Sequence, residues 1–238
     1  MFPLTHIYCA NRIVNSPDKL ILYGSIFPDI PITGLIEWEA IKEKTVAFSN
    51  FIILTQKNLT MFAIGLLLHE ESLGIDRFVH GKNGYAIKKG QKIKPYVKKY
   101  FLNENILDTA HTFIELAVEI KILSKNPNLV KDAKDSIQYC DKYIENISSL
   151  FASFFNKETA KTLSLIQAYN QNIIGINMQS DFASLINRLK NSNVEENHIN
   201  KIIEKSLLII DKDYEKFLSG AIKRCKEDLA VFELDKSK

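Results

Sequence analysis

Histidines and carboxylates recur at helical spacing in one apolar stretch of the sequence. In GLLLHEESLGIDRFVHG (Gly65–Gly81), Asp76 and His80 follow His69 at steps of seven and eleven residues. At about 100° per residue, these steps return to within roughly 20° of one line on a helix surface. The spacing therefore predicts that the three side chains share one face of a single helix.

A second set stands in HTFIE, where Glu115 follows His111 by four residues. Such a pair projects a nitrogen and an oxygen ligand from one helix face, as in helical bundles that hold metal ions. Imidazole and carboxylate suit zinc, iron or manganese, and a set without cysteine leaves a coordination position for water. Phe113 and Ile114 lie between the two polar residues, where an unpaired charge is costly. We interpret both sets as ligands of one metal centre.

The same residues also have a purely structural interpretation. A histidine on an apolar face is more often a hydrogen-bonded core residue than a ligand, and a His–Glu pair is often just a solvated helix pair. The second half of the chain has no comparable set. His198 has polar neighbours and is interpreted as a surface residue.

Hydrophobic periodicity indicates which elements must position these residues. A helical period runs through most of the chain, while strict alternation and internal repeats are nearly absent. The sequence predicts an all-α fold with residues 1–125 carrying the site and residues 126–238 forming a helical region packed on it, and we expect both parts to form one domain. Ser180 and Asp181 are expected helix caps. The expected helices are 6–15, 35–54, 59–80, 104–125, 129–155, 157–176, 180–190 and 195–225.

Two segments outside these helices bear on the site. Pro28 and Pro31 restrict the backbone around Asp29, which is therefore expected at a helix end or in a turn. Residues 81–101 contain seven lysines and are interpreted as a loop leading into a short helix. Those lysines either meet an anionic substrate or form a solvated loop.

Composition limits the class of protein. The chain has 238 residues, 46% of them hydrophobic, which is enough for a substantial core, and a net charge of only +3, which does not by itself indicate nucleic acid or membrane as a partner. Three widely spaced cysteines suggest neither a disulfide framework nor a thiolate zinc site. No secretory leader and no apolar run of about 18 residues is visible. We expect a cytoplasmic protein without a transmembrane segment.

Taken in order, four segments resemble the metal-binding segments of the zinc-dependent phospholipase C family, whose helical fold is shared with fungal and plant single-strand-specific nucleases. Each segment is short, so their order carries the resemblance, which covers about the first half of the chain. The segments are PLTHIYCA, GSIFPDI, GLLLHEESLGIDRFVHGKNGYA and DTAHTFIE.

The resemblance implies a zinc-dependent hydrolase of phosphodiester bonds with one to three zinc ions, or alternatively iron or manganese. The anionic substrate would be a lipid headgroup, a nucleotide or a similar phosphodiester. Asp29, in the Pro-Asp turn, would be the catalytic residue, bridging metals or acting as a base, and His6 would be an outer ligand. The implied metal ligands are His6, Asp29, His69, Asp76, His80, His111 and Glu115.

The chain departs from the family pattern in two places. The family has a further histidine between the Asp turn and the helical set, but residues 30–68 contain none. The helical His and Asp are commonly four apart, whereas position 73 is Leu73 and the acid is Asp76. Two other functions stay open: a non-catalytic helical protein that keeps the fold for interaction, and another helical metallohydrolase acting on nucleotides. The adjacent His-Asp pair typical of one large class of the latter is absent.

Overall fold

The computed structural model describes residues 2–81, 83–102, 105–175, 184, 186–187, 190 and 192–236, and all the secondary structure described there is helical. The expected all-α class is thereby confirmed. The caps expected at Ser180 and Asp181 lie outside the described residues. The elements follow in the order α1 (Pro3–Ile13), α2 (Lys19–Ile26), η1 (Phe27–Thr33), α3 (Trp38–Thr55), η2 (Lys57–Leu59), α4 (Thr60–His69), α5 (Asp76–Val79), α6 (Tyr85–Lys98), α7 (Ile106–Lys125), α8 (Leu129–Cys140), η3 (Asp141–Tyr143), α9 (Ile144–Phe155), α10 (Thr159–Gly175), α12 (Glu196–Ile210) and α13 (Tyr214–Lys236).

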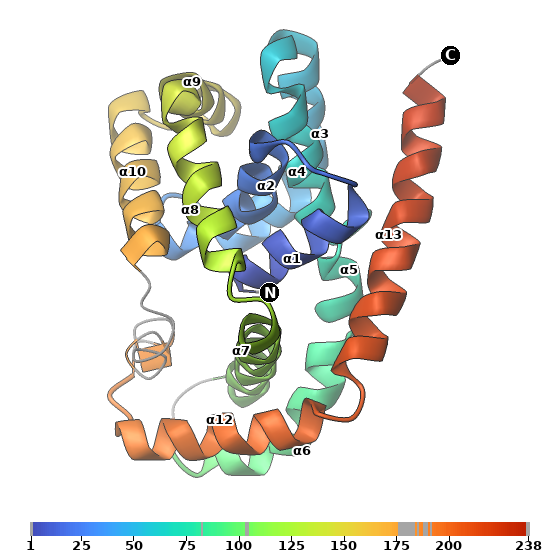
Figure 1. Ribbon diagram of the computed structural model, residues 1–238. Coiled ribbons are helices and arrows are strands. Elements are labelled where there is room, and N and C mark those ends of the chain that lie inside the picture. The colour runs from blue at the N-terminus through green and yellow to red at the C-terminus, as the bar shows by residue number, and fades with distance from the viewer. Residues whose placement is uncertain are drawn as a thin grey trace.

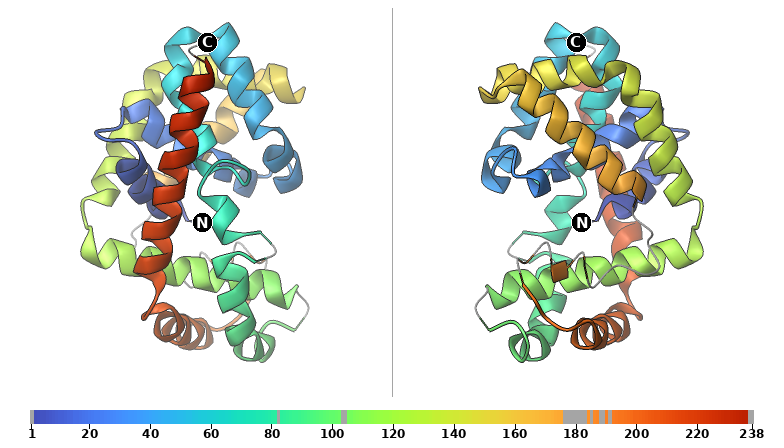
Figure 2. Two further views of the ribbon diagram at one scale, coloured as in Figure 1. Left: turned by 90° about the vertical axis from the view of Figure 1, so that its right-hand side faces the viewer. Right: turned by 90° about the vertical axis from the view of Figure 1, so that its left-hand side faces the viewer.

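The helices form an upper bundle and a lower layer (Figure 1). Helices α1 to α4 and α8 to α10 make up the bundle, α7 crosses beneath it, and α6 and α12 lie below α7 (Figures 1 and 2). Helix α13 runs along one side from the lower layer toward the top. Helices α8 and α13 pack on α1, and α12 packs on α7, so the part of the chain after residue 126 supports the part before it.

Helices α2 and α4 form the centre of the bundle because both are apolar around most of their circumference. They approach closely at two glycines. A Cβ atom on Gly24 would lie 2.2 Å from the carbonyl oxygen of Phe62, and one on Gly65 would lie 2.3 Å from that of Ile21. This contact matters for the site described below, since Ser25 lies in the last turn of α2 and His69 ends α4.

The structure corrects the expectation of one continuous helix over residues 59–80. Helix α4 ends at His69, and Glu70 adopts an extended conformation with ψ of 168°. The Glu70 carboxylate accepts hydrogen bonds from the backbone N–H and the hydroxyl of Ser72, each at 2.8 Å. A Cβ atom on Gly74 would lie 2.5 Å from the Glu70 nitrogen, so the turn is too tight for a larger residue. Side-chain hydrogen bonding to the local backbone has ended the helix.

The lysine-rich segment also differs from its expected form. The loop reaches only to Gly84, and α6 then continues for 14 residues. Its buried positions are Ala86, Gly90, Ile93 and Val97, whose spacing is that of one helix face packed on a neighbour. That neighbour is α7, and most of the lysines occupy the remaining faces of α6.

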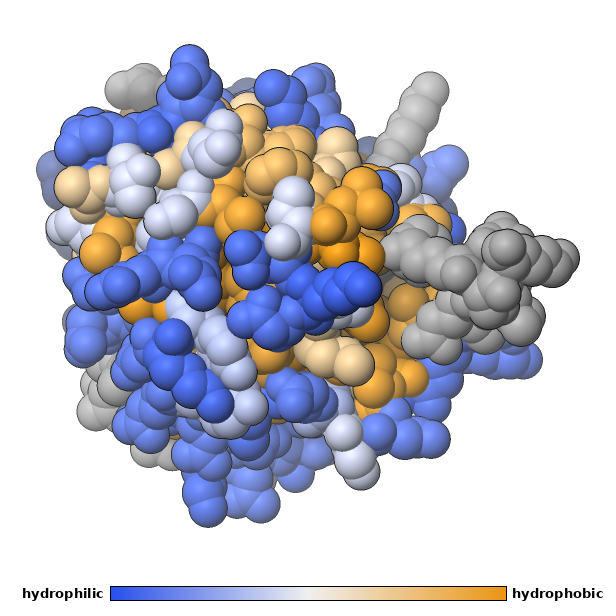
Figure 3. Space-filling model, turned by 90° about the horizontal axis from the view of Figure 1, so that it is seen from above, coloured by the Kyte–Doolittle hydropathy of each residue, from blue (hydrophilic) through white to orange (hydrophobic). Residues whose placement is uncertain are grey.

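No helix among the described residues is long and apolar enough to cross a bilayer. The surface seen from above mixes hydrophobic with hydrophilic side chains (Figure 3). Single exposed apolar residues such as Leu54 and Met61 are normal on a folded domain.

Candidate metal centre

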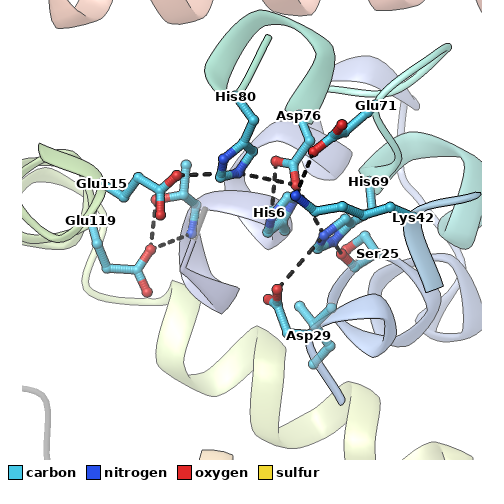
Figure 4. A network of polar contacts seen from close by, with 12 residues as sticks. His6, Ser25, Asp29, Lys42, His69, Glu71, Asp76, His80, Glu115 and Glu119 are labelled. Carbon is cyan, nitrogen blue, oxygen red and sulfur yellow. Dashed lines mark hydrogen bonds and ion pairs between the residues drawn. The ribbon is translucent and has the colours of Figure 1, made fainter. Parts of the chain in front are cut away.

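The structure brings all seven expected ligand residues to one place, between the upper bundle and α7. Figure 4 labels all of them except His111. They arrive on five separate segments. In chain order these are His6 from α1, Asp29 from η1, His69 from the end of α4, Asp76 from the start of α5 together with His80 from the position after α5, and His111 with Glu115 from α7.

His6, His69 and Asp76 form a first triad, in which each residue offers one ligand atom within 4.8 Å of the others. His69 Nε2 lies 3.2 Å from Asp76 Oδ2, and His6 Nε2 lies 3.6 Å from Asp76 Oδ1. The two imidazole rings stack with centroids 3.8 Å apart. Two ligands at about 2.1 Å from one zinc ion are no more than ~4.2 Å apart, so the triad can close on an ion with small side-chain adjustments.

His80, His111 and Glu115 form a second triad of the same kind. Glu115 Oε1 lies 3.1 Å from His80 Nε2 and 3.9 Å from His111 Nε2. The two rings meet edge to face, with centroids 5.4 Å apart. Both Nε2 atoms therefore point toward the carboxylate, as donors around one ion would.

Asp76 contacts both triads. Its Oδ2 atom lies 3.2 Å from His69 Nε2 in the first triad and 3.4 Å from His80 Nε2 in the second. A carboxylate between two sets of nitrogen ligands can bridge two ions, and ions in two-metal hydrolytic sites lie ~3.5–4 Å apart. The geometry is thus that of a site able to hold two neighbouring ions.

Asp29 lies at the edge of the first triad. Its Oδ1 atom is 3.7 Å from His69 Nε2, and 14% of its side chain is exposed. Pro28 and Pro31 flank it within η1, which ends at Gly34 in the left-handed conformation with φ of 73°. Asp29, expected at a helix end or in a turn, lies in the first turn of a 3₁₀ helix that directly follows α2. This short helix holds the carboxylate from outside the helices that carry the two triads.

A backbone carbonyl fixes the orientation of His69, and a carboxylate lies near the ring of His111. His69 Nδ1 lies 2.8 Å from the Ser25 carbonyl oxygen, so we assign the proton to Nδ1, which donates to that carbonyl and leaves the Nε2 lone pair for a metal. His111 Nδ1 lies 3.6 Å from Asp108. Lys190 in turn pairs with Asp108 at 2.6 Å, so the charge of Asp108 is itself balanced.

Several polar atoms of the cluster have no hydrogen-bond partner in the described part of the chain, although they are buried. They include both ring nitrogens of His6, Oδ2 of Asp29 and Nδ1 of His111. Leaving a buried polar atom unsatisfied costs about 1–3 kcal/mol. A metal ion coordinated by His6 and Asp29 would remove part of this penalty, and a nitrogen and oxygen donor set fits zinc.

The charges in the cluster favour metal-binding protonation states. Burial and the neighbouring His69 hold the pKa of His6 well below its usual value. Burial opposes ionisation of Asp76, but positive groups around it, including His69 and His80, outweigh burial and hold its pKa well below the usual range. A neutral imidazole and an ionised carboxylate are the forms that coordinate a metal.

Asp29 behaves differently from Asp76. Burial raises its pKa to about 6, and the charge of His69 only partly offsets this. For His69 and His80, burial lowers the pKa but the nearby carboxylates outweigh it, so that both pKa values are raised. Protons therefore compete with a metal for these three groups near neutral pH.

Glu119 is a supporting residue that the sequence interpretation missed. Its carboxylate accepts hydrogen bonds from the backbone N–H of Leu4 at 2.9 Å and from the N–H and hydroxyl of Thr5, both at 2.6 Å. It therefore caps α1 from α7 and fixes the turn that carries His6 (Figure 4). The available signal was its place four residues after Glu115, in the pattern HxxxExxxE within an apolar stretch.

Other candidates from the sequence lie elsewhere. His198 stacks on Tyr100 with ring centroids 4.1 Å apart, outside the cluster. Lys89 pairs with Asp213 rather than with a group of the site. The first half of the chain thus supplies every residue of the two triads.

No protein-family model, curated protein or solved structure matches this chain. A functional proposal therefore depends on the geometry and chemistry of the cluster.

Proposed function

We propose that this chain is a zinc-dependent hydrolase of phosphodiester bonds, similar in fold and chemistry to the zinc-dependent phospholipase C family. The position of Asp76 carries the proposal. Its carboxylate joins a buried triad of nitrogen and oxygen groups to a second, partly exposed one, a more specific arrangement than a lone structural histidine or a solvated His–Glu pair would need.

The ligands divide into two sets with Asp76 shared between them. His6 and His69 complete the first position, while His80, His111 and Glu115 complete the second. Zinc bound there would supply Lewis-acid polarisation of a phosphoryl oxygen and lower the pKa of water. Two adjacent positions suit phosphodiester hydrolysis, because the attacking and the leaving oxygen both need stabilisation.

Asp29 is the proposed general base. Its carboxylate sits beside the first position with one oxygen 3.7 Å from His69 Nε2, and its pKa of about 6 leaves it mostly ionised at neutral pH. A base with a pKa close to the working pH accepts a proton efficiently. In this role Asp29 orients the attacking water and takes its proton.

The substrate would approach on the side where the cluster is most exposed. His80, His111 and Asp29 have the largest exposed fractions of the set, 17%, 14% and 14%. Lys42 reaches the cluster from α3, paired with Glu71 at 3.0 Å (Figure 4). Its ammonium group offers a positive charge to an anionic lipid headgroup or nucleotide.

Hydrolysis of bis(p-nitrophenyl) phosphate tests the proposal. We expect turnover by the zinc-loaded chain, loss of turnover with chelator, and recovery when zinc is restored. His111→Ala should lose metal and activity together because it removes a ligand and leaves Glu115 buried beside an empty position. His198→Ala, outside the cluster, is the matched control and should keep both.

Three results would contradict the proposal. Full turnover in the presence of chelator would exclude a metal-dependent reaction. Metal-loaded chain without turnover of any phosphodiester would favour a non-catalytic protein that uses the metal structurally. Hydrolysis of nucleotide monoesters with no action on diesters would identify the chain as a nucleotide phosphohydrolase.

A further inference from the structure

Helix α6 carries a concentrated positive charge. Its residues Tyr85–Lys98 include five lysines and no Asp or Glu, and Lys99 follows directly. The buried side of α6 lies directly on α7: a Cβ atom on Gly90 would be 3.1 Å from the backbone nitrogen of His111. The lysines therefore lie mainly on the sides of α6 that α7 leaves uncovered.

Helix α12 lies beside α6 and runs in the opposite direction. The ring of Tyr100 stacks on His198, and Lys205 Nζ lies 5.1 Å from the ring of Tyr96. Further along, Tyr85 donates a hydrogen bond to Asp213 at 2.7 Å. These contacts extend along both helices, and Figure 2 shows the two helices seen end-on, next to each other beneath α7.

The two helices present one continuous basic surface, which we call the α6–α12 face. On α12, the buried positions Ile199, Ile202, Ser206 and Ile210 turn the opposite positions outward. The face consists of Lys88, Lys92, Lys99, Lys201, Lys205 and Lys212. Within the described part of the chain, none of these lysines forms an ion pair with a carboxylate.

Exposed apolar side chains stand among these lysines. Leu208, one turn beyond Lys205, is 71% exposed, and Tyr96 is 45% exposed. Of the acids near this face, Asp213 pairs with Lys89 and Asp211 pairs with Lys121, while Glu204, four residues before Leu208, is exposed. The face thus combines excess positive charge with projecting apolar groups.

We propose that the α6–α12 face docks on a membrane surface rich in anionic lipids. Lysines near such a surface are attracted by its negative potential, and an apolar side chain on the same face can enter the boundary between headgroups and acyl chains. All six cations are lysines, whereas arginine is the residue suited to bidentate recognition of single phosphates and base edges. Leu208 likewise suits a lipid boundary and adds nothing to contacts with a nucleic-acid backbone.

Docking in this orientation would place α7 between the membrane and the metal centre. The inference goes beyond the proposed hydrolase activity, because the face shares none of the metal ligands and its binding needs no turnover. Vesicle binding by metal-free chain therefore tests it separately from the function of the cluster.

Co-sedimentation with vesicles is the test. The chain should bind phosphatidylcholine vesicles that contain about a third phosphatidylserine and should bind pure phosphatidylcholine vesicles far less. Binding to the anionic vesicles should weaken as salt is added. Each lysine contributes roughly a fivefold factor, so the combined variant Lys88→Gln, Lys92→Gln and Lys201→Gln should bind about a hundredfold less. Leu208→Ser should weaken binding several-fold while leaving its salt dependence unchanged.

A matched control removes the same number of charges elsewhere: Lys131→Gln, Lys157→Gln and Lys161→Gln, all exposed, should bind almost as the wild type does. Equal binding by the two triple variants would overturn the proposal, as would equal binding to vesicles with and without phosphatidylserine. Duplex DNA that binds the α6–α12 face more tightly than the anionic vesicles do would instead identify a nucleic-acid surface.

Discussion

Asp76 receives contacts from histidines on three segments of the chain. His6 reaches it from α1, His69 from the end of α4, and His80 from the residue after α5. Burial alone would favour the protonated acid, but the surrounding positive charge holds the pKa of Asp76 well below its usual range. An ionised carboxylate shared by two ligand sets is the central feature of the proposed site.

Replacing Asp29 separates catalysis from metal binding. Asp29→Asn keeps the shape of the side chain at the edge of the first triad but removes the group that accepts a proton. We expect bound metal to be largely retained and phosphodiester turnover to fall by roughly 10²-fold or more, measured side by side on the same preparation. The control is Asp135→Asn, which removes a carboxylate from a partly exposed ion pair with Lys19 and should keep both the bound metal and the turnover. Full turnover in Asp29→Asn would remove Asp29 from the mechanism.

Metal affinity should fall as pH is lowered. The metal-free chain holds Asp29 with a pKa of about 6, and His69 and His80 with raised pKa values. Because ligands bind metal in their deprotonated forms, protons compete increasingly as pH drops through this range. Zinc competition with a chelator of known affinity, measured from about pH 8 to about pH 5, should show this decline. A pH-independent affinity would mean that these groups do not coordinate the metal.

At the scale of elements, the glycine contact between α2 and α4 positions His69. Gly65→Ala would drive a methyl group into the backbone of α2, and we expect a loss of about 3 kcal/mol in the free energy of unfolding. Gly220→Ala in α13 meets nothing within 4 Å and should be neutral or stabilising by up to about 1 kcal/mol. Chemical denaturation of both variants measures the difference; equal stabilities would show that the two helices are less closely packed.

Glu119 links two elements of the site by capping α1 from α7. Glu119→Gln puts an amide NH₂ group where the N–H groups of Leu4 and Thr5 need acceptors, so we expect a loss of about 1–3 kcal/mol in stability and weaker metal binding through His6. Glu215→Gln is the control, because Glu215 is 62% exposed and its ion pair with Lys125 lies at the surface. We expect it to change the free energy of unfolding by less than about 0.5 kcal/mol. Identical melting curves for the two variants would refute the capping role.

The sequence predicted which polar residues lie together better than it predicted the elements that carry them. His111 and Glu115 lie on one long helix with strong periodicity, as expected. His69, Asp76 and His80 do meet, but across a turn, because side-chain hydrogen bonds from Glu70 and the tight packing at Gly74 outweigh the apolar helical pattern.

The sequence interpretation also left two supports of the site unidentified. Helix α2 was not predicted, although Asp18 caps it by accepting a hydrogen bond from the Leu20 N–H at 2.7 Å. Its Ser25 carbonyl, which orients His69, is a backbone atom that any residue type provides. Such tertiary contacts cannot be inferred from spacing along one chain.

At the scale of the whole molecule, the second half of the chain braces the first. Helix α12 packs on α7 and α13 on α1, the two helices that carry His111 with Glu115 and His6. Lys190 reaches back to Asp108 beside His111. The fold thus brings candidate ligands from distant segments within 4.8 Å of one another in each triad, while the proposed α6–α12 face lies apart from them.

The most direct test of the account is the metal content of the chain purified without chelator and then equilibrated with zinc. Elemental analysis should find about two ions per chain, as expected for a bridged two-metal site. Asp76→Asn should lower the content to one ion or fewer, because it weakens the shared ligand, while Glu71→Gln beside the cluster should leave it unchanged. A wild-type chain that retains no stoichiometric metal, or an Asp76→Asn chain that retains two ions, would contradict the account.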